Sequence, residues 1–418
     1  MPFRGAARAG MKALAGVFSL LPLWAAEPGR PFPGAISPPE AVAAIHSALE
    51  TEADESAAVR LLRERRARLK ELIATQPAAA LELRLPERIR ERLLRLSPTI
   101  RDLFEEQGEW EDEAEVIEED DFARGISRTR YRMNTGGRNL ALHFVEPPPA
   151  LKCGDRIRVQ GVRVDDQAAV QLAGVQVSAA GCSTLGDQKT AVLLLNFPSA
   201  SLPPALTPSS VYSIFFGSTP RSQSDHWRES SYGRTWSSGA VFGPFTLSQN
   251  YSCGQDTQIR DAAIAAADSA VDFRLYTRLV LVLPLACGGL GTVGCRTLTS
   301  ADGSFTASTI WVGTDAFNTS DLAVCMAVHE GGHNFGLRHA STLAFSSAPL
   351  SSLGAVGSHD EYGDYFSLMG ACFNYGGSQL LGHYAAPHKQ MLGWFAPGNV
   401  ATVQTGGSYT IQPFENTT

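Results

Sequence analysis

Three histidines and one glutamate lie within the segment HEGGHNFGLRHA, residues 329–340. The whole chain has only nine histidines, so this short segment holds a third of them. On a helix, His329 and His333 lie one turn apart on the same face, where both imidazoles can bind one metal ion. Glu330 can then reach a water molecule on that metal without being a ligand itself. The spacing therefore predicts a zinc site with Glu330 as its general base.

The residues after the second histidine supply a third ligand. Gly336, at the expected helix end, can adopt a positive φ and turn the chain sharply, which brings His339 back towards the metal. Three histidines leave the fourth position of a tetrahedral zinc ion to water. An isolated histidine is usually a satisfied core residue, but these fixed offsets favour a metal site. We predict one catalytic Zn²⁺ bound by His329, His333 and His339.

The full pattern, H-E-x-x-H-x-x-G-x-x-H, is the metzincin signature, and metzincins also have a methionine in a turn below the metal. The segment EYGDYFSLMG places Met369 thirty residues after His339, where that turn is expected. Together with APHKQMLGW and SSYGRTWSSGAVFGPFTL, these segments resemble the gametolysin family of secreted zinc metallopeptidases. The resemblance covers about residues 188–397. It implies a metzincin fold, one catalytic zinc and cleavage of peptide bonds in extracellular proteins.

The resemblance also implies a role for each site residue. The three histidines match the ligands, Glu330 the base and Met369 the Met-turn residue that supports the site by packing. In the implied mechanism zinc activates a water molecule and polarises the scissile carbonyl, and Glu330 moves the proton of that water to the leaving amine. Two positions depart from the family. Gly331 stands where a bulky aliphatic residue is usual, at a cost of about 1 kcal/mol of helix propensity, and no tyrosine stands two positions after Met369.

Further side chains near the motif offer alternative sites. A downstream glutamate is the third ligand in other zinc-protease classes, so four residues are alternative ligands: His359, Glu361, His383 and His388. With His339 in register, we interpret these four as surface or core residues. Asp360, Glu361 and Asp364 offer a Ca²⁺ site that no further feature supports, and a hydrogen-bonded loop is the favoured interpretation.

The periodicity of the chain indicates the elements that position these residues. Residues 40 to about 104 have helical spacing, and from about residue 127 the period changes to two, which predicts a small β-barrel or sandwich. From Gln188 onwards, buried strands alternate with amphipathic helices. We predict an α/β (α+β) metzincin-like catalytic domain with a mixed twisted sheet and a long active-site helix. The predicted parts are 1–26 signal peptide, 27–126 helical and acidic pro-region, 127–185 small β module of the pro-region, 186–397 zinc protease domain and 398–418 start of a C-terminal β segment.

The N-terminus predicts export. Arg4, Arg8 and Lys12 precede a short apolar run that ends in small residues, which is typical of a secretory signal peptide. A buried N-terminal helix is the alternative. No later segment reaches about 18 uninterrupted apolar residues, so we expect no stable membrane anchor. The predicted location is secreted, extracellular or periplasmic.

Composition and charge narrow the class of protein. The chain of 418 residues has 44% hydrophobic and 18% charged residues, as a globular protein of two or three domains does. The net charge of −7 provides no basic footprint for a nucleic-acid partner. Carboxylates crowd the stretch from Glu105 to Asp121, which we interpret as a solvated linker, with a calcium or partner site as the alternative.

Seven cysteines fit an oxidising compartment, and their odd number leaves at least one unpaired within the chain. The segment CGGLGTVGC favours a local pair, because its glycines can fold the loop back on itself. Cys153 also offers a thiolate that could block the zinc, although a disulfide in a turn is the favoured interpretation. The candidate pairs are Cys287–Cys295, Cys153–Cys182 and Cys325–Cys372, with Cys253 left over.

We therefore predict an exported zinc endopeptidase that acts on protein or peptide substrates; the sequence does not indicate the oligomeric state. One rival is a catalytically inactive zinc-binding surface or adhesion protein, which would have no use for Glu330 beside the metal. Another is a zinc hydrolase that acts on something other than protein.

Overall fold

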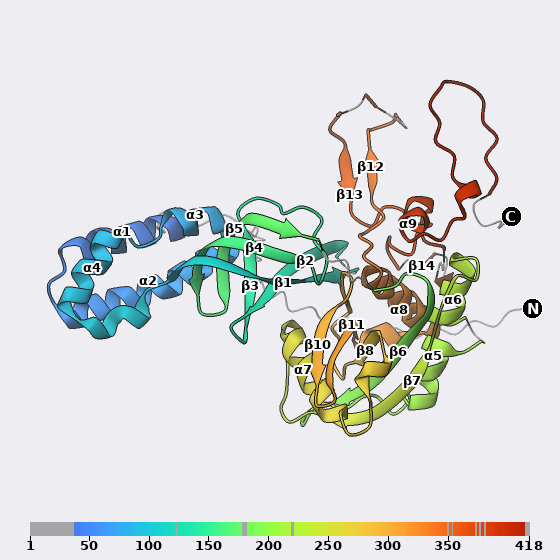
Figure 1. Ribbon diagram of the computed structural model, residues 1–418, viewed down its shortest axis with the longest axis horizontal. Helices are drawn as coiled ribbons and strands as arrows, with labels where there is room; N and C mark the ends of the chain where they lie inside the picture. Colours follow the sequence, from blue (N-terminus) through green and yellow to red (C-terminus); the bar gives the residue numbers. More distant parts are fainter. Residues whose placement is uncertain are drawn as a thin grey trace, which may run out of the picture.

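The computed structural model shows a helical arm, a five-stranded module and a larger mixed α/β part (Figure 1). The predicted signal peptide, residues 1–26, lies outside the described residues. Among the described residues, which are given in the next sentence, no helix has the length and hydropathy that a membrane span needs. The described residues are 37–122, 124–177, 182–218, 221–348, 351–352, 354–372, 374–375, 378–379 and 382–413.

The helical arm confirms the prediction, made from periodicity, that residues 40 to about 104 are helical. Its first helix is capped by Ser37, which forms a capping box with Glu40. Buried leucines and isoleucines from several helices form its core. The Arg65 guanidinium donates to the buried Glu105 carboxylate at 2.6 Å. The elements of the arm are α1 (Pro38–Thr51), α2 (Glu55–Thr75), α3 (Pro77–Glu82), α4 (Glu87–Leu96) and the 3₁₀ turn η1 (Pro98–Leu103).

Five strands form the next module: β1 (Glu106–Asp121), β2 (Ile126–Thr135), β3 (Arg138–Phe144), β4 (Arg156–Val164) and β5 (Gln167–Gln176). Their pairing forms a closed circuit, because β1 pairs with β2, β2 with β3, β3 with β5, β5 with β4 and β4 with β1. Only the β3–β5 pair is parallel. The strands begin at Glu106, before the predicted start of the β module at residue 127.

The interpretation of the acidic stretch as a solvated linker is wrong. All of this stretch after Glu105 forms the 16-residue strand β1, and three carboxylates of the strand, Glu115, Glu118 and Asp120, are buried. Each of the three faces cationic or imidazole groups from distant parts of the chain. A buried carboxylate needs such a partner. Local sequence patterns could not indicate these partners, because they lie more than 100 residues away.

The mixed α/β architecture is confirmed in the third part of the chain. Strands run in the order β9-β11-β8-β6-β7, with β9 antiparallel to β11 and the other neighbours parallel. Strand β10 forms a hairpin with β11. The bounds are β6 (Gly186–Asn196), β7 (Thr235–Thr246), β8 (Arg278–Val282), β9 (Gly289–Thr292), β10 (Arg296–Ser300) and β11 (Gly303–Val312).

Helices cover both faces of this sheet. Side chains alternate along β6, so that Val192 and Leu194 pack with α8 while Leu193 and Leu195 face the side of α7. This explains why β6 is a continuous apolar run. Helices α5 (Pro208–Phe216), α6 (Gln223–Ser230) and α8 (Ser320–Asn334) cover one face, and α7 (Asp256–Ala267) covers the other.

The chain after α8 contains mostly loops with short elements. These are β12 (Thr342–Ala344), β13 (Ser358–Asp360), β14 (Asn374–Tyr375), β15 (Ser378–Gln379), α9 (Ala386–Met391) and η5 (Pro397–Asn399). Among the described residues 400–413 there is no strand, although their alternation predicts the start of a β segment. These residues are exposed and pair with no neighbouring strand, and an extended segment without a partner cannot form a ladder.

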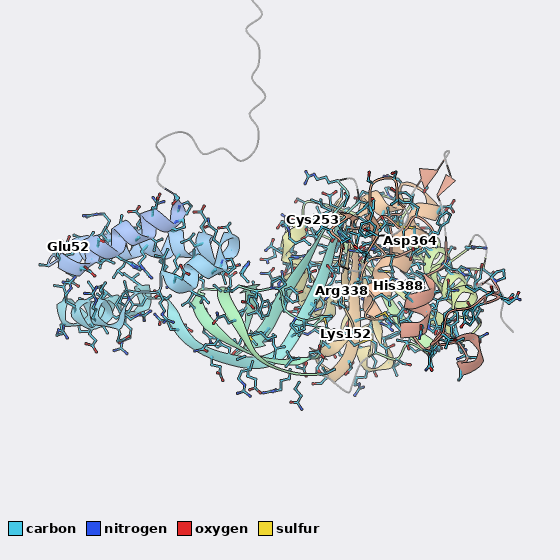
Figure 2. All side chains as sticks on the ribbon, turned by 90° about the horizontal axis from the view of Figure 1, so that it is seen from above. Glu52, Lys152, Cys253, Arg338, Asp364 and His388 are labelled. Carbon is cyan, nitrogen blue, oxygen red and sulfur yellow. A yellow bond between two sulfur atoms is a disulfide. The ribbon has the colours of Figure 1, made fainter. Side chains whose placement is uncertain are left out.

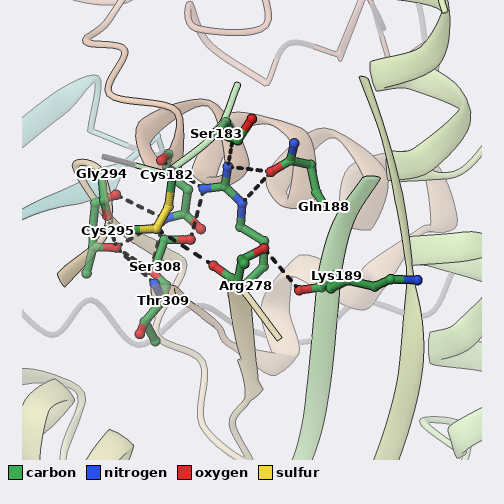
Figure 3. Close-up of a disulfide and its surroundings, with 12 residues drawn as sticks. Cys182, Ser183, Gln188, Lys189, Arg278, Gly294, Cys295, Ser308 and Thr309 are labelled. Atoms are coloured by element: carbon green, nitrogen blue, oxygen red, sulfur yellow. Dashed lines mark hydrogen bonds between the residues drawn. A yellow bond between two sulfur atoms is a disulfide. The ribbon is translucent and has the colours of Figure 1, made fainter. Parts of the chain in front are cut away.

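The disulfides correct two of the three candidate pairs. The structure pairs Cys182 with Cys295 (Figure 3) and Cys253 with Cys287, whereas Cys325–Cys372 is confirmed. The segment between Cys287 and Cys295 does not fold back as a local loop, because its residues Gly289–Thr292 form the extended strand β9, which carries the two cysteines apart. Cys153, and not Cys253, is the free cysteine, and it is buried.

Candidate metal centre

Helix α8, which covers one face of the mixed sheet, carries the first two histidines. The helix begins after Thr319, whose hydroxyl accepts a hydrogen bond from the Leu322 amide at 3.1 Å. Its end is a Schellman motif, in which Leu337 N–H donates to Gly332 O and Gly336 N–H donates to His333 O. Gly336 has φ +90°, as the sequence predicts. The chain therefore turns back and brings His339 to the two helical histidines.

The three imidazoles surround one point. Their ring centroids are 4.9–5.3 Å apart. Nδ1 of His329 lies 2.6 Å from Leu368 O and Nδ1 of His333 lies 2.9 Å from Leu337 O, while Nδ1 of His339 lies 2.8 Å from Glu361 Oε1. An acceptor at each Nδ1 favours the tautomer that a metal ligand needs, in which Nδ1 carries the proton and Nε2 is free to bind an ion.

A carboxylate from the five-stranded module lies opposite the three imidazoles, at the same shared point. Asp120 Oδ2 lies 3.3 Å from Nε2 of both His329 and His333, and Asp120 Oδ1 lies 3.0 Å from Nε2 of His339. Burial alone would raise the pKa of Asp120, but the three neighbouring imidazoles outweigh it and hold that pKa well below its usual range. The four side chains form the one compact group of metal-ligating residues found in the described parts of the chain.

These four side chains fit a zinc ion. In a tetrahedral site with ligands at about 2.0–2.1 Å, neighbouring ligand atoms lie about 3.3–3.4 Å apart. The distances from Asp120 Oδ2 to Nε2 of His329 and of His333 match that separation, and the distance from Oδ1 to Nε2 of His339 is 3.0 Å. Nε2 of His329 and of His339 are also buried without a hydrogen bond of good geometry, which is costly unless another group binds them. Nitrogen and carboxylate ligands are the donors that zinc accepts.

Glu330 is buried beside this group and has no hydrogen-bond donor on either carboxylate oxygen. Burial and the neighbouring Asp120 charge raise the pKa of Glu330 well above its usual value. The carboxylate lies against β9 at two glycines: a Cβ on Gly289 would come within 2.1 Å of Glu330 Oε1, and a Cβ on Gly291 within 3.0 Å of Oε2. The glycines of this segment therefore allow strand β9 to approach helix α8.

The packing around α8 explains its unusual glycine pair. A Cβ on Gly331 would lie 2.4 Å from the ring of Trp227, and a Cβ on Gly332 would lie 2.2 Å from Sδ of Met369. Trp227 is fixed there, because its indole N–H donates to Tyr384 Oη at 3.0 Å. Met369 is fully buried directly beneath the helix. Gly331 thus provides space for an indole, which the sequence alone left unexplained.

Two aromatic residues of the centre were missed in the sequence. The Tyr362 hydroxyl donates to Asp120 Oδ1 at 2.6 Å, and its ring centroid lies 4.6 Å from that of His339. Phe122, two residues after Asp120, packs edge-on against His329. Asp120 itself had no distinguishing signal among the many carboxylates of its stretch. Tyr362 lies within the segment EYGDYFSLMG but not at the family position after Met369.

The other candidate ligands lie outside the centre. His359 is exposed, His383 lies 3.1 Å from Glu229 Oε1, and burial lowers the pKa of His388. Glu361 supports His339 from behind and is not placed at the shared point. The loop interpretation holds for Asp360 and Asp364, whose carboxylates accept the amide hydrogens of Tyr362 and Phe366.

Cys153 lies away from the centre and against strand β1. Its thiol donates to Val116 O, and it accepts from Val116 N–H at 3.2 Å. Burial raises the pKa of the thiol to about 12, so that the sulfur stays protonated. A protonated, buried thiol is a poor metal ligand.

A comparison with protein families bears directly on this centre. The family model described as gametolysin peptidase M11 matches residues 189–417, which is more than half of the chain. The chain belongs to the gametolysin family. The match begins in β6 and includes α8 and the three histidines, but not the helical arm or β1–β5. No curated protein matches this gametolysin-family chain.

Proposed function

We propose that this gametolysin-family chain is a secreted, zinc-dependent endopeptidase of the metzincin type that hydrolyses peptide bonds in extracellular proteins. The observation that carries the proposal is the meeting of three imidazole Nε2 atoms at one buried point with the unpartnered Glu330 carboxylate beside it. Membership of a peptidase family supports the same reaction. A binding protein would have no need for an unpaired carboxylate next to its metal, because burying that group costs stability.

Zinc bound by His329, His333 and His339 would supply a Lewis acid that polarises the scissile carbonyl and makes water nucleophilic at neutral pH. Residues of the chain itself orient the imidazoles, transfer the proton and stabilise the negative charge. Acceptors on every Nδ1 fix the imidazole rings in place. Because burial raises its pKa, Glu330 is a stronger base than an exposed carboxylate; it takes the proton of the attacking water and passes it to the leaving amine. The Tyr362 hydroxyl offers a donor to negative charge on the carbonyl oxygen.

The proposal extends to the organisation of the chain. Residues 1–26 would direct export, residues 27–185 would form a pro-region with a helical arm and a small β-barrel, and residues 186–397 would form a metzincin-like catalytic domain. Three disulfides fit the oxidising environment outside the cell. Met369 would support the centre as the Met-turn residue, by packing against Gly332.

The test combines metal analysis with a cleavage assay. The purified full chain should contain one zinc per molecule and, after limited proteolysis, should cleave casein in a reaction that a chelator stops. Glu330→Gln should keep the zinc and lose at least about a hundredfold of the cleavage rate, the smallest contribution typical of a general base. Asp302→Asn is the matched control, because it makes the same carboxylate-to-amide change on an exposed residue and should keep full activity.

Each rival predicts a different result. An inactive zinc-binding adhesion protein would bind zinc without cleaving casein or gelatin. A hydrolase for another substrate would cleave a small ester or amide but no protein. Undiminished casein cleavage by Glu330→Gln would contradict the assigned role of Glu330.

A further inference from the structure

We propose that Asp120 is a fourth protein ligand of the metal, and that strand β1 keeps the peptidase latent by occupying the place of its substrate. This inference rests on the proposed function, since it concerns the same centre. It assigns to the acidic N-terminal stretch the zinc-blocking role that the sequence analysis considered for Cys153 only as an alternative. It is supported by the pairing of β1 with β9, by the position of Asp120 and by the contacts that hold both in place.

Strand β1 covers the free edge of the mixed sheet. Strand β9 pairs with β11 on one side, and on its other side Ile117–Asp120 of β1 pairs antiparallel with Gly289–Thr292. Main-chain pairing along a sheet edge is a general way to bind an extended peptide. A substrate that lies along β9 beside Glu330 would need the edge that β1 occupies.

Asp120 ends this paired segment at the metal centre. Its carboxylate contacts the Nε2 atoms of all three histidines at 3.0–3.3 Å and accepts a hydrogen bond from Tyr362. The side chain is fully buried. With three imidazoles and this carboxylate as ligands, a tetrahedral zinc ion has no position left for the water that hydrolysis requires.

Charged contacts on β1 hold this arrangement together. Glu118 forms an ion pair with Arg338, one residue before the ligand His339. The Arg338 guanidinium also donates to Leu151 O at 3.0 Å, and Figure 2 shows Arg338 and Lys152 close together where the five-stranded module meets the mixed sheet. Glu115 lies between Arg260 of α7 and Arg296 of β10.

Asp120 and the paired segment of β1 must be displaced together. Phe122 packs on His329 and on Tyr362, so that apolar contacts cover the centre just beyond Asp120. Any peptide that replaced β1 along β9 would also have to remove this carboxylate from the metal. Cys153 contributes to the same strand only by its hydrogen bonds to Val116.

The experiment uses the full chain loaded with Co²⁺, whose visible absorption spectrum reports the ligands around it. Wild type is compared with Asp120→Asn, which keeps the side-chain size, and with Asp120→Ala. Asp121→Asn is the matched control, because Asp121 is the next residue of the same strand and its carboxylate pairs with Arg124. The added probe is acetohydroxamate, a small chelating ligand that needs an accessible metal position.

The spectra of both Asp120 variants should differ from those of wild type and Asp121→Asn. Acetohydroxamate should shift the spectra of the Asp120 variants at concentrations that leave wild type unchanged. The Asp120 variants should hold the metal at least about tenfold more weakly, as loss of even an outer supporting residue does. They should also cleave peptides without prior proteolysis, whereas the wild-type full chain should not.

Two results would overturn the inference in different ways. If wild type binds one Co²⁺ and its spectrum responds to acetohydroxamate as the Asp120 variants do, the fourth position is open; Asp120 is then no ligand, and the proposed function stands. This measurement on wild type does not depend on how well a variant folds. If the wild-type chain binds no Co²⁺ at all, the proposed function fails, and the inference fails with it.

Discussion

Each histidine of the centre is oriented by an acceptor at Nδ1, the nitrogen that faces away from the shared point. For His329 and His333 the acceptors are main-chain carbonyl groups, which substitution cannot remove. For His339 the acceptor is the partly exposed carboxylate of Glu361. The position of His339, the one histidine of the three that lies outside α8, therefore depends on a single side chain.

Glu361→Ala should lower zinc affinity about 10- to 100-fold, because His339 loses the hydrogen bond that fixes its tautomer and ring orientation. Glu361→Gln keeps an oxygen acceptor and should stay close to wild type. Competition with a chromophoric chelator measures both affinities. Equal zinc affinity in the wild type and the alanine variant would show that Glu361 does not orient His339.

Gly331 illustrates a residue whose reason lies entirely in tertiary packing. Helix propensity alone predicts that alanine at this position gains about 1 kcal/mol. The Cβ would however lie 2.4 Å from the buried Trp227 ring. Gly331→Ala should therefore destabilise the fold, since overpacking typically costs about 1–3 kcal/mol.

A double-mutant cycle with Trp227→Phe, read by chemical denaturation, tests the cause of this loss. Removing the larger ring should make Gly331→Ala less costly than it is in wild type. If the two substitutions are additive, the steric explanation is wrong.

At the scale of the elements, the sequence predicted α8 and the chain reversal after it but not the strand that faces them. Capping residues, apolar spacing and Gly336 indicate the helix and its end. Strand β9 has only four residues, two of them glycine, and glycine has low strand propensity. Those glycines allow the strand to lie close to Glu330. The periodicity of a sequence does not indicate such a contact.

Gly289→Ala should destabilise the fold and displace Glu330, because the new methyl group would come within 2.1 Å of its carboxylate. Gly174→Ala on β5 is the control, since a Cβ there meets no atom closer than 4.0 Å. Thermal denaturation and peptide cleavage, measured together, should both fall for the first variant and stay unchanged for the second. Full activity of Gly289→Ala would contradict the close contact.

At the scale of the whole molecule, carboxylates of the N-terminal part meet basic and histidine side chains of the mixed α/β part. The sequence showed the acidic stretch and the histidines separately, but pairing across more than 100 residues follows from topology and not from local pattern. The closed circuit of β1–β5 and the β1–β9 pairing place Asp120 at the centre. Helices and buried strands were predictable because their periodicity is local.

The contact between strand β1 and the mixed α/β part should lose stability in acid, because it depends on the charge of Glu115. Burial alone would raise the pKa of Glu115, but the charges of Arg260 and Arg296 outweigh it and lower the pKa from 4.5 to about 2. The group is therefore ionised more readily in the folded chain, and its contribution to stability is complete above about pH 4.5 and is lost as the pH falls towards 2.

Glu115→Gln should lower the free energy of unfolding by about 3–5 kcal/mol at neutral pH, because the buried Arg260 and the partly buried Arg296 both lose this carboxylate. The difference from wild type should shrink as the pH falls from about 4.5 to about 2. Denaturation curves of both proteins across this range measure it. A difference that is constant with pH would mean that Glu115 carries no charge in the folded chain.

The most direct test of the central claim is X-ray absorption at the zinc edge of the purified full chain. The centre described here predicts one zinc with three imidazole ligands and one oxygen ligand at about 2.0–2.2 Å. Outer-shell scattering from the imidazole rings identifies the histidines. A sulfur ligand at about 2.3 Å, or a zinc environment with fewer than three imidazoles, would contradict the account.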